Sequence, residues 1–307
     1  MRLIYMGTPD FAATVLKGIY DAGHEIVGVI SQPDKPKNRG MQMQPTPVKM
    51  QAEALGLPVY QPETLKNGAI LPYLEEKAPE IIVVVAYGKI LPEYILNFPK
   101  YGCINMHASL LPMYRGAAPI QWSILNGEKE TGVTSMHMDK GLDTGDMILK
   151  SKVEITETDT AATLHDKLAD CAASLCAETL EALSSGTAPR EKQNDAASTY
   201  APLLTKELGN IDWAKPTREI LDKVRGLFPW PGAYSYKDGE RFKIIEVCKA
   251  EGKGTPGEVL ENSGKLVVAT GDGAVEILTL QMPGKKQMAA SALLLGNPIP
   301  KHTIFGG

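Results

Sequence analysis

Residues 80–88, EIIVVVAYG, and residues 102–107, GCINMH, decide the fold that this sequence predicts. Both runs are largely apolar and lack the alternation of a half-exposed strand, so each is typical of a strand buried on two faces. Residues 2–7 and 25–31 have the same character. Four such runs indicate a parallel sheet that is covered by helices.

Helical patterns alternate with these strands. Residues 9–22 predict a helix with Thr8 as its N-cap and Pro9 in the first helical position, and residues 46–55 predict a second helix. This alternation implies right-handed βαβ units. Further along the chain the pattern predicts two strands that extend the sheet, at 131–139 and 147–155, and a long helix at 158–186.

The rest of the chain predicts a second domain. A short helix is expected at 216–227, and the short strands beyond it are separated by Asp-Gly, Asn-Ser-Gly and Gly-Asp-Gly. This hairpin spacing is typical of a small OB-like β-barrel. We therefore expect an α/β chain with a Rossmann-like parallel-sheet domain at 1–189, a linker at 190–209 and an OB-like barrel at 210–307.

The composition is that of a globular protein of two domains, with 307 residues, 43% hydrophobic and 22% charged. No apolar run reaches the ~20 residues that span a bilayer, and the N-terminus MRLIYMGTPDF contains no secretory signal. We therefore expect a cytoplasmic protein without membrane contact. The four cysteines form no CxxC pair, which argues against a zinc site, and no metal is expected.

Charge is distributed unevenly along the chain. Residues 1–202 contain 18 basic and 24 acidic residues, whereas residues 203–307 contain 14 basic and 12 acidic residues. A mildly basic second domain permits a polyanionic partner without requiring one.

Asn105 and His107 stand at the carboxyl end of a predicted strand, where parallel sheets bind their ligands. Residues two apart in a strand point to the same side. An amide and an imidazolium together make a donor pair suited to a developing oxyanion. An acid that orients the histidine could be Asp143 or Asp146, although Asp-Thr-Gly-Asp alone is more typical of a turn.

The first predicted strand ends in MGTPDF, where Gly7 stands alone. A dinucleotide site would need the close-approach glycines of a Gly-x-Gly-x-x-Gly motif. The sequence therefore argues against a nicotinamide or flavin nucleotide. A Walker A motif and an HExxH motif are also missing from the sequence.

The stretch 31–49, SQPDKPKNRGMQMQPTPVK, is much longer than the two to six residues usual for a βα connection. It leaves the same sheet edge as His107. Basic residues in such a loop could bind a phosphate backbone beside the site, although a solvated surface loop is the alternative. Its basic residues are Lys35, Lys37, Arg39 and Lys49.

Two stretches, NMHASLLPMYRGAAPI and ETGVTSMHMDKGLDTGDMI, resemble the core signature of the 10-formyltetrahydrofolate-dependent formyltransferases. The resemblance implies transfer of a formyl group to a primary amine, and it favours Asp143 over Asp146. It implies that Asn105, His107 and Asp143 are catalytic. It also implies that the folate co-substrate is bound by Ser109, Leu110, Leu111 and Pro112.

Over residues 1–295 the chain is similar to the members of this family that formylate methionylated initiator tRNA. The matching motifs, in order, are MGTPDFA, QPDKPKNRG with PTPVK, VVVAYGKILP, IDW, PWPGA and VATGDG. The similarity implies that 34–49 enters the acceptor stem, with Arg39 as the key arginine and Lys35, Lys37 and Lys49 beside it, and that the barrel adds tRNA contacts. We expect a monomer. The tail GNPIPKHTIFGG matches nothing in the family pattern.

The implied reaction gives N-formylmethionyl-tRNA for translation initiation. The unprotonated α-amine would attack the formyl carbon, Asn105 and His107 would meet the oxyanion, and Asp143 would pair with the charged form of His107. The closest rival is a formyltransferase for a small amine, such as glycinamide ribonucleotide or an amino-sugar nucleotide, against which the basic loop argues. A folate hydrolase and a non-catalytic nucleic-acid-binding module are further alternatives.

Overall fold

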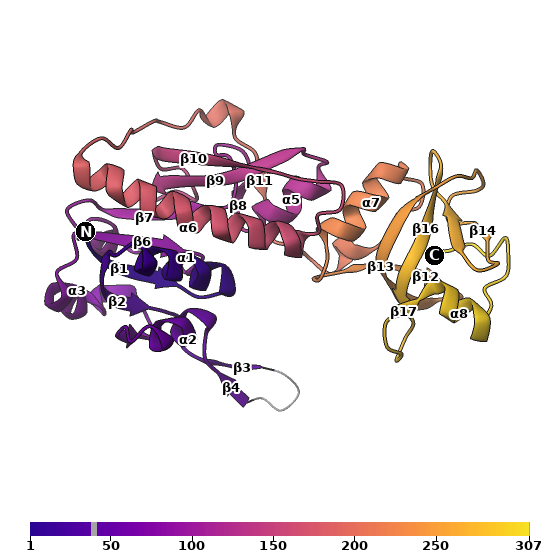
Figure 1. Cartoon of the computed structure of the whole chain (residues 1–307), viewed down its shortest axis with the longest axis horizontal. Coiled ribbons are helices and arrows are strands. Elements are labelled where there is room, and N and C mark those ends of the chain that lie inside the picture. Colours follow the sequence, from indigo (N-terminus) through magenta and orange to yellow (C-terminus); the bar gives the residue numbers. More distant parts are fainter. Residues whose placement is uncertain (38–41, 307) are drawn as a thin grey trace. The chain divides into compact units, whose positions relative to one another are not determined.

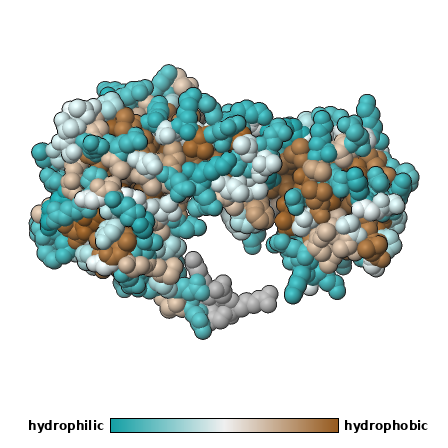
Figure 2. Space-filling model, viewed as in Figure 1, coloured by the Kyte–Doolittle hydropathy of each residue, from teal (hydrophilic) through white to brown (hydrophobic). Residues whose placement is uncertain are grey.

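The computed structural model describes residues 1–37 and 42–306, which fall into two compact units (Figure 1). The first unit contains residues 1–116, 130–154 and 165–201, and the second contains 117–129, 155–164 and 202–307. Among the described residues, the helices are all too short or too polar to cross a membrane. Hydrophilic side chains cover much of the surface of each unit that Figure 2 shows, with smaller hydrophobic areas between them.

A seven-stranded sheet in the order β10-β9-β7-β6-β1-β2-β5 forms the core of the first unit. Five neighbouring strands, from β5 to β7, are parallel, and β9 runs antiparallel to both of its neighbours, β7 and β10, so the sheet is mixed. The expected Rossmann-like sheet and its extension are confirmed. The strands are β1 (Arg2–Gly7), β2 (Glu25–Ile30), β5 (Val59–Tyr60), β6 (Ile81–Val85), β7 (Cys103–His107), β9 (Glu130–His137) and β10 (Met147–Glu154).

The sheet is apolar on both faces because helices cover each of them. Alternate residues of β1 show this: Ile4 and Met6 belong to an apolar cluster with residues of α3 and α4, whereas the Tyr5 hydroxyl donates to the Ala12 carbonyl of α1 at 2.5 Å. Such burial explains why the strands lack polar alternation. The helices of this unit are α1 (Asp10–Asp21), α2 (Pro47–Ala54), α3 (Leu71–Lys77), α4 (Glu93–Leu96), most of α6 (Ala161–Ser185), and the short 3₁₀ turns η1 (Lys66–Gly68) and η2 (Asp195–Ala197).

The expected cap of α1 is wrong by one residue. Pro9 is the N-cap, and its neighbour Thr8 donates its hydroxyl to the Tyr87 carbonyl at 3.0 Å. The Thr8 hydroxyl therefore connects the loop after β1 to the loop after β6. Helix α1 begins at Asp10 without a side-chain cap.

Several short elements of the first unit have no clear signal in the sequence. A hairpin of β3 (Lys35–Lys37) and β4 (Gln42–Gln44) stands inside the basic stretch. A two-stranded parallel sheet joins β8 (Arg115–Gly116) to β11 (Tyr200–Ala201). This pairing attaches the stretch after α6 to the residues that follow β7.

The second unit is built on an antiparallel sheet, which Figure 1 draws in orange to yellow. Its strand order is β12-β13-β16-β15-β14, with β17 paired to β16. The sheet encloses an apolar core that includes Trp213, Phe242 and Val268. The expected small, OB-like antiparallel fold is confirmed. Its elements are α5 (Pro119–Leu125), η3 (Glu207–Gly209), α7 (Thr217–Gly226), β12 (Ala233–Lys237), β13 (Glu240–Ala250), β14 (Val259–Glu261), β15 (Leu266–Ala269), β16 (Ala274–Gln281), β17 (Met288–Ala289) and α8 (Ala290–Gly296).

The tail after α8 belongs to this core, although its sequence matched no family pattern. The Val259 N–H donates to the Thr303 carbonyl and the Phe305 N–H donates to the Gly257 carbonyl, at 2.9 and 2.8 Å. Phe305 is 2% exposed, and its ring centroid lies 5.0 Å from that of Phe242. The tail therefore covers the β14 edge and fills the core of the second unit.

Candidate active site

Asn105 and His107 lie at the carboxyl end of β7, between β6 and β9. Val84 of β6 is paired with Asn105, and Thr134 of β9 is paired with His107. Their spacing places both side chains on one face of the sheet. His107 is buried, whereas Asn105 is half-buried and its amide makes no hydrogen bond within the described part of the chain. The Asn105 amide is therefore available to a ligand.

The His107 imidazole is held from both sides. Its Nε2 lies 2.9 Å from the Tyr114 carbonyl oxygen, and its Nδ1 lies 3.6 Å from Asp143 Oδ2. A carbonyl oxygen can only accept, so Nε2 carries a hydrogen. A second proton on the ring would sit on Nδ1, facing the carboxylate. The Asp143 carboxylate therefore faces the ring on its Nδ1 side, and the Tyr114 carbonyl holds it on the Nε2 side.

Geometry separates the two aspartates of the loop between β9 and β10. Asp143 has the left-handed φ of 53° and accepts the Gly116 N–H at Oδ2, 2.9 Å away, while facing His107. Asp146 instead accepts from Arg190 Nε at 2.7 Å, and this hydrogen bond lowers the pKa of Asp146 below its usual value. The structure thus places Asp143, and not Asp146, beside the histidine.

The Ser109–Pro112 stretch forms a tight loop directly after β7. The Ser109 hydroxyl donates to the Met113 carbonyl at 2.6 Å, and the Leu111 N–H donates to Thr134 Oγ1 at 3.0 Å. The Thr134 hydroxyl in turn donates to the Ser109 carbonyl at 2.7 Å. Ser109 and Leu111 are buried, whereas Leu110 and Pro112 are half-buried. The serine therefore shapes the loop, and the half-buried residues offer surface to a ligand.

The basic residues of the 31–49 stretch are placed differently from one another. Lys35 is exposed on β3, where its Nζ lies 3.2 Å from Gln32 Oε1. Lys49, on α2, donates to Asp34 Oδ2 at 2.7 Å, and this bond raises the pKa of Lys49. Lys37 lies on β3, and Arg39 lies outside the described residues. A phosphate would meet Lys35 more readily than Lys49, whose charge is already paired.

Two contacts to the site come from backbone groups that residue types do not reveal. Tyr114 supplies the carbonyl for His107, and Gly116 supplies the N–H for Asp143. Tyr114 has a φ of 60°, which directs its peptide groups away from an extended path. Tyr114 and Gly116 follow His107 by seven and nine residues. This spacing alone does not identify them, because their roles depend on how the chain turns back after β7.

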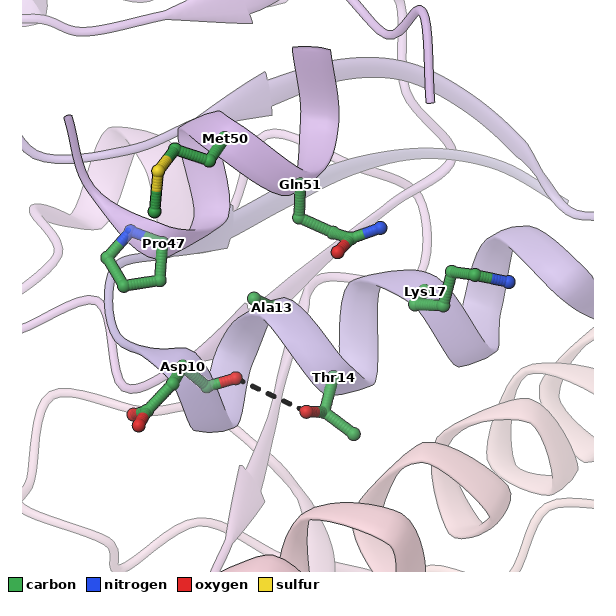
Figure 3. A pocket seen from close by; sticks show the side chains of 7 residues that line it. All are labelled: Asp10, Ala13, Thr14, Lys17, Pro47, Met50 and Gln51. Carbon is green, nitrogen blue, oxygen red and sulfur yellow. Dashed lines mark hydrogen bonds between the residues drawn. The ribbon is translucent and has the colours of Figure 1, made fainter. Parts of the chain in front are cut away.

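A separate hollow of about 490 Å³ lies between α1 and α2 (Figure 3). The side chains of Asp10, Lys17, Met50 and Gln51 surround it, and Thr14 donates to the Asp10 carbonyl at 3.4 Å. None of the residues that line it is Asn105, His107 or Asp143. We therefore do not assign the chemistry to this hollow.

Comparison with known proteins decides the family. The family described as "Formyl transferase" matches residues 1–180, and "Formyl transferase, C-terminal domain" matches residues 203–298. A methionyl-tRNA formyltransferase of Caldanaerobacter subterraneus subsp. tengcongensis is 52% identical, covering 99% of this chain and 100% of the relative. The chain belongs to the methionyl-tRNA formyltransferase family. A second member, from Geotalea uraniireducens, is 49% identical over 100% of this chain and 98% of its own.

The fold also occurs in more distant formyltransferases. An N-formyltransferase from Helicobacter canadensis, solved in complex with folinic acid and dTDP-3-aminofucose, superposes with a TM-score of 0.68 at 21% identity. The match covers 92% of this formyltransferase chain and 99% of that one. At this identity the likeness shows the fold alone. The expected formyltransferase family is confirmed by the closer relatives.

Proposed function

We propose that this formyltransferase moves the formyl group of 10-formyltetrahydrofolate to the α-amine of methionylated initiator tRNA. The observation that carries the proposal is the full-length identity of about half to methionyl-tRNA formyltransferases. The product would be N-formylmethionyl-tRNA, which starts translation. We expect the enzyme to act in the cytoplasm, as a monomer.

The proposed chemistry assigns one role to each of three side chains. The unprotonated amine attacks the formyl carbon, and the Asn105 amide donates to the oxyanion of the tetrahedral intermediate. His107, as an imidazolium, supplies positive charge beside that oxygen, and Asp143 balances it across 3.6 Å. The amine loses a proton to water, and the folate nitrogen leaves with a proton.

The hydrogen bond of His107 limits how it can take part. Its Nε2–H already donates to the Tyr114 carbonyl. A direct contact to the oxyanion would require this hydrogen to be shared with, or taken from, Tyr114. Asn105 has no such competitor among the described residues, so we assign it the direct hydrogen bond and His107 the electrostatic part.

We further propose that the loop after β7 borders the folate. Leu110 and Pro112 are half-buried and leave surface for an aromatic ring system, whereas Ser109 and Leu111 fix the loop to Thr134. In this assignment Ser109 and Leu111 stabilise the loop, whereas the alternate residues Leu110 and Pro112 contact the folate.

We expect Arg39→Ala to weaken binding of methionylated tRNA while leaving folate binding unchanged. Loss of one phosphate contact should make the plot of log affinity against log salt shallower by about one unit. Equilibrium binding between 50 and 300 mM salt measures this slope. Arg39→Lys keeps the charge and Lys100→Ala removes one elsewhere, so an equal loss in all three variants would contradict a specific role for Arg39.

The second unit offers a surface suited to RNA. Trp230 is 55% exposed beside a hollow of about 220 Å³, and Arg241 stacks over the Tyr234 ring with Cζ 5.1 Å from its centroid. Lys206 and Lys243 are exposed at the same hollow. Aromatic rings among basic side chains bind unpaired nucleotides by stacking and charge. This surface supports the proposal that the barrel contacts tRNA.

Trp230→Ala is therefore expected to raise the KM for methionylated tRNA about tenfold, with little change in kcat, because one stacked base contributes about 1–3 kcal/mol. Steady-state kinetics with folate saturating would measure the split. Leu295→Ala removes another exposed apolar side chain of the same unit and should behave as wild type. An unchanged KM in Trp230→Ala would remove this surface from the tRNA interface.

The experiment that tests the proposed function is formyl transfer from 10-formyltetrahydrofolate to methionylated initiator tRNA. Uncharged tRNA, methionylated elongator tRNA, free methionine and a water-only reaction serve as controls. Transfer confined to the charged initiator supports the proposal. Formyl loss without transfer to any tRNA would leave a small-amine acceptor or water, and would overturn the tRNA assignment.

A further inference from the structure

The stretch 190–201, which follows α6, is expected from sequence to be a linker, yet it is bound to the catalytic loops of the first unit. We call it the linker segment. Its β11 strand pairs with β8, so that Tyr200 lies beside Arg115 and Ala201 beside Gly116. The approach is close, because a Cβ on Gly116 would come within 2.7 Å of the Ala201 carbonyl oxygen. The linker segment is therefore part of the site's framework.

The two main-chain groups that bond to the side chains of His107 and Asp143 are held by this segment. Tyr114, whose carbonyl accepts from His107, donates its own N–H to Thr199 Oγ1 at 2.8 Å. Gly116, whose N–H donates to Asp143, is the residue paired with Ala201. The position of each partner thus depends on the linker segment.

Gln193 reaches the aspartate loop itself. Its Nε2 donates to the carbonyls of Asp143 and Gly145, each at 2.8 Å. Its Oε1 accepts from Nε and Nη2 of Arg115, at 3.0 and 2.8 Å. All polar atoms of the Gln193 amide are therefore occupied. The Arg115 guanidinium is also held by Asp195 Oδ1, at 2.7 Å, within the same segment.

We propose that Gln193, oriented by Arg115, is a positioning residue that holds the Asp143 carboxylate at His107. Thr199 has the matching task at Tyr114. The inference rests on the catalytic roles proposed above. An amide is required at position 193, because it must accept from a guanidinium on one side and donate to two carbonyls on the other. A carboxylate could satisfy only the first of these.

Gln193→Glu separates the contact to Arg115 from the contacts to the Asp143 and Gly145 carbonyls. It keeps the acceptor for Arg115 but replaces the two donors with a charged oxygen that faces two carbonyls. We expect kcat for formyl transfer to fall about 10- to 100-fold, as for displaced catalytic groups, with the KM of both substrates within about twofold of wild type. The pH dependence of kcat/KM should also shift, because the charge partner of the imidazole moves.

Matched variants keep the test informative. Gln51→Glu makes the same chemical change on α2, where the side chain has no hydrogen bond in the described residues, and it should retain wild-type kcat and pH profile. If Gln193→Glu does not fold, Thr199→Val provides the second test. It removes one hydroxyl at nearly constant shape and should lower kcat about tenfold. Thermal unfolding of each variant checks the folded state.

The outcomes separate this inference from the proposed function. If the wild-type enzyme transfers the formyl group, and folded Gln193→Glu and Thr199→Val both have the kcat of the wild type, the positioning role alone is overturned. A lower kcat with an unshifted pH profile would mean a general structural role and would also overturn it. A wild-type enzyme without transfer activity would instead overturn the proposed function.

Discussion

Asn105→Ala is expected to lower kcat for formyl transfer by at least about 10²-fold, the usual effect of removing one oxyanion donor. The amide lies half-buried at the end of β7 and has no hydrogen-bond partner in the described chain, so its donors are free for the reacting oxygen. Because the interaction forms mainly in the transition state, the KM of each substrate should change little. Single-turnover kinetics with both substrates saturating would measure the step directly.

Asn105→Asp is the informative companion. It keeps the shape of the side chain but has no donor when ionised and brings a negative charge toward the developing oxyanion. It should therefore be at least as slow as Asn105→Ala. Near-wild-type turnover in either variant would refute the role assigned to Asn105.

His107→Ala is expected to reduce kcat by at least about 10²-fold as well, because the positive charge beside the intermediate is lost. Asp143→Asn should also be slow, although an asparagine oxygen could still accept the Gly116 N–H. The asparagine carries no charge to balance an imidazolium 3.6 Å away. The rates of both variants, measured by the same transfer assay, report on the pair.

The double variant distinguishes a pair from two separate residues. If Asp143 acts through His107, His107→Ala combined with Asp143→Asn should be no slower than His107→Ala alone, because groups that act as a unit are not additive. Multiplied effects would contradict the pairing. His107 is buried, so thermal unfolding must accompany each rate to exclude a loss of folded enzyme.

Much of the fold could be predicted because the first unit follows simple patterns. The strands around β6 are buried on both faces and form unbroken apolar runs, and the two helices predicted between strands, α1 and α2, begin within one residue of their predicted positions. The shorter helices α3 and α4 were not predicted. The short β3–β4 and β8–β11 pairs could not be predicted in this way. They are held by backbone hydrogen bonds over a few residues, which leave no periodicity in the side chains.

The site shows the same division. Asn105 and His107 could be proposed from their place at a strand end, but Asp143 was distinguished from Asp146 only by family resemblance. The structure provides the physical reason. The Asp146 carboxylate is bonded to Arg190, whereas Asp143, which has a left-handed φ, faces His107. The contribution of Gln193 had no signal, because its contacts are to main-chain carbonyls far away in sequence.

The attachment of the linker segment bears on how such a chain can recombine. A crossover near residue 189, where sequence periodicity ends, would join an Asp143 loop from one parent to a Gln193 from the other. A crossover after Ala201 would keep the aspartate, the glutamine and Arg115 from a single ancestor. Residues 117–129 and 155–164 would still come from the first parent, although they belong to the second unit. Chimeric members of the family are therefore expected to tolerate the later breakpoint better, and only when these two inner segments suit the new barrel.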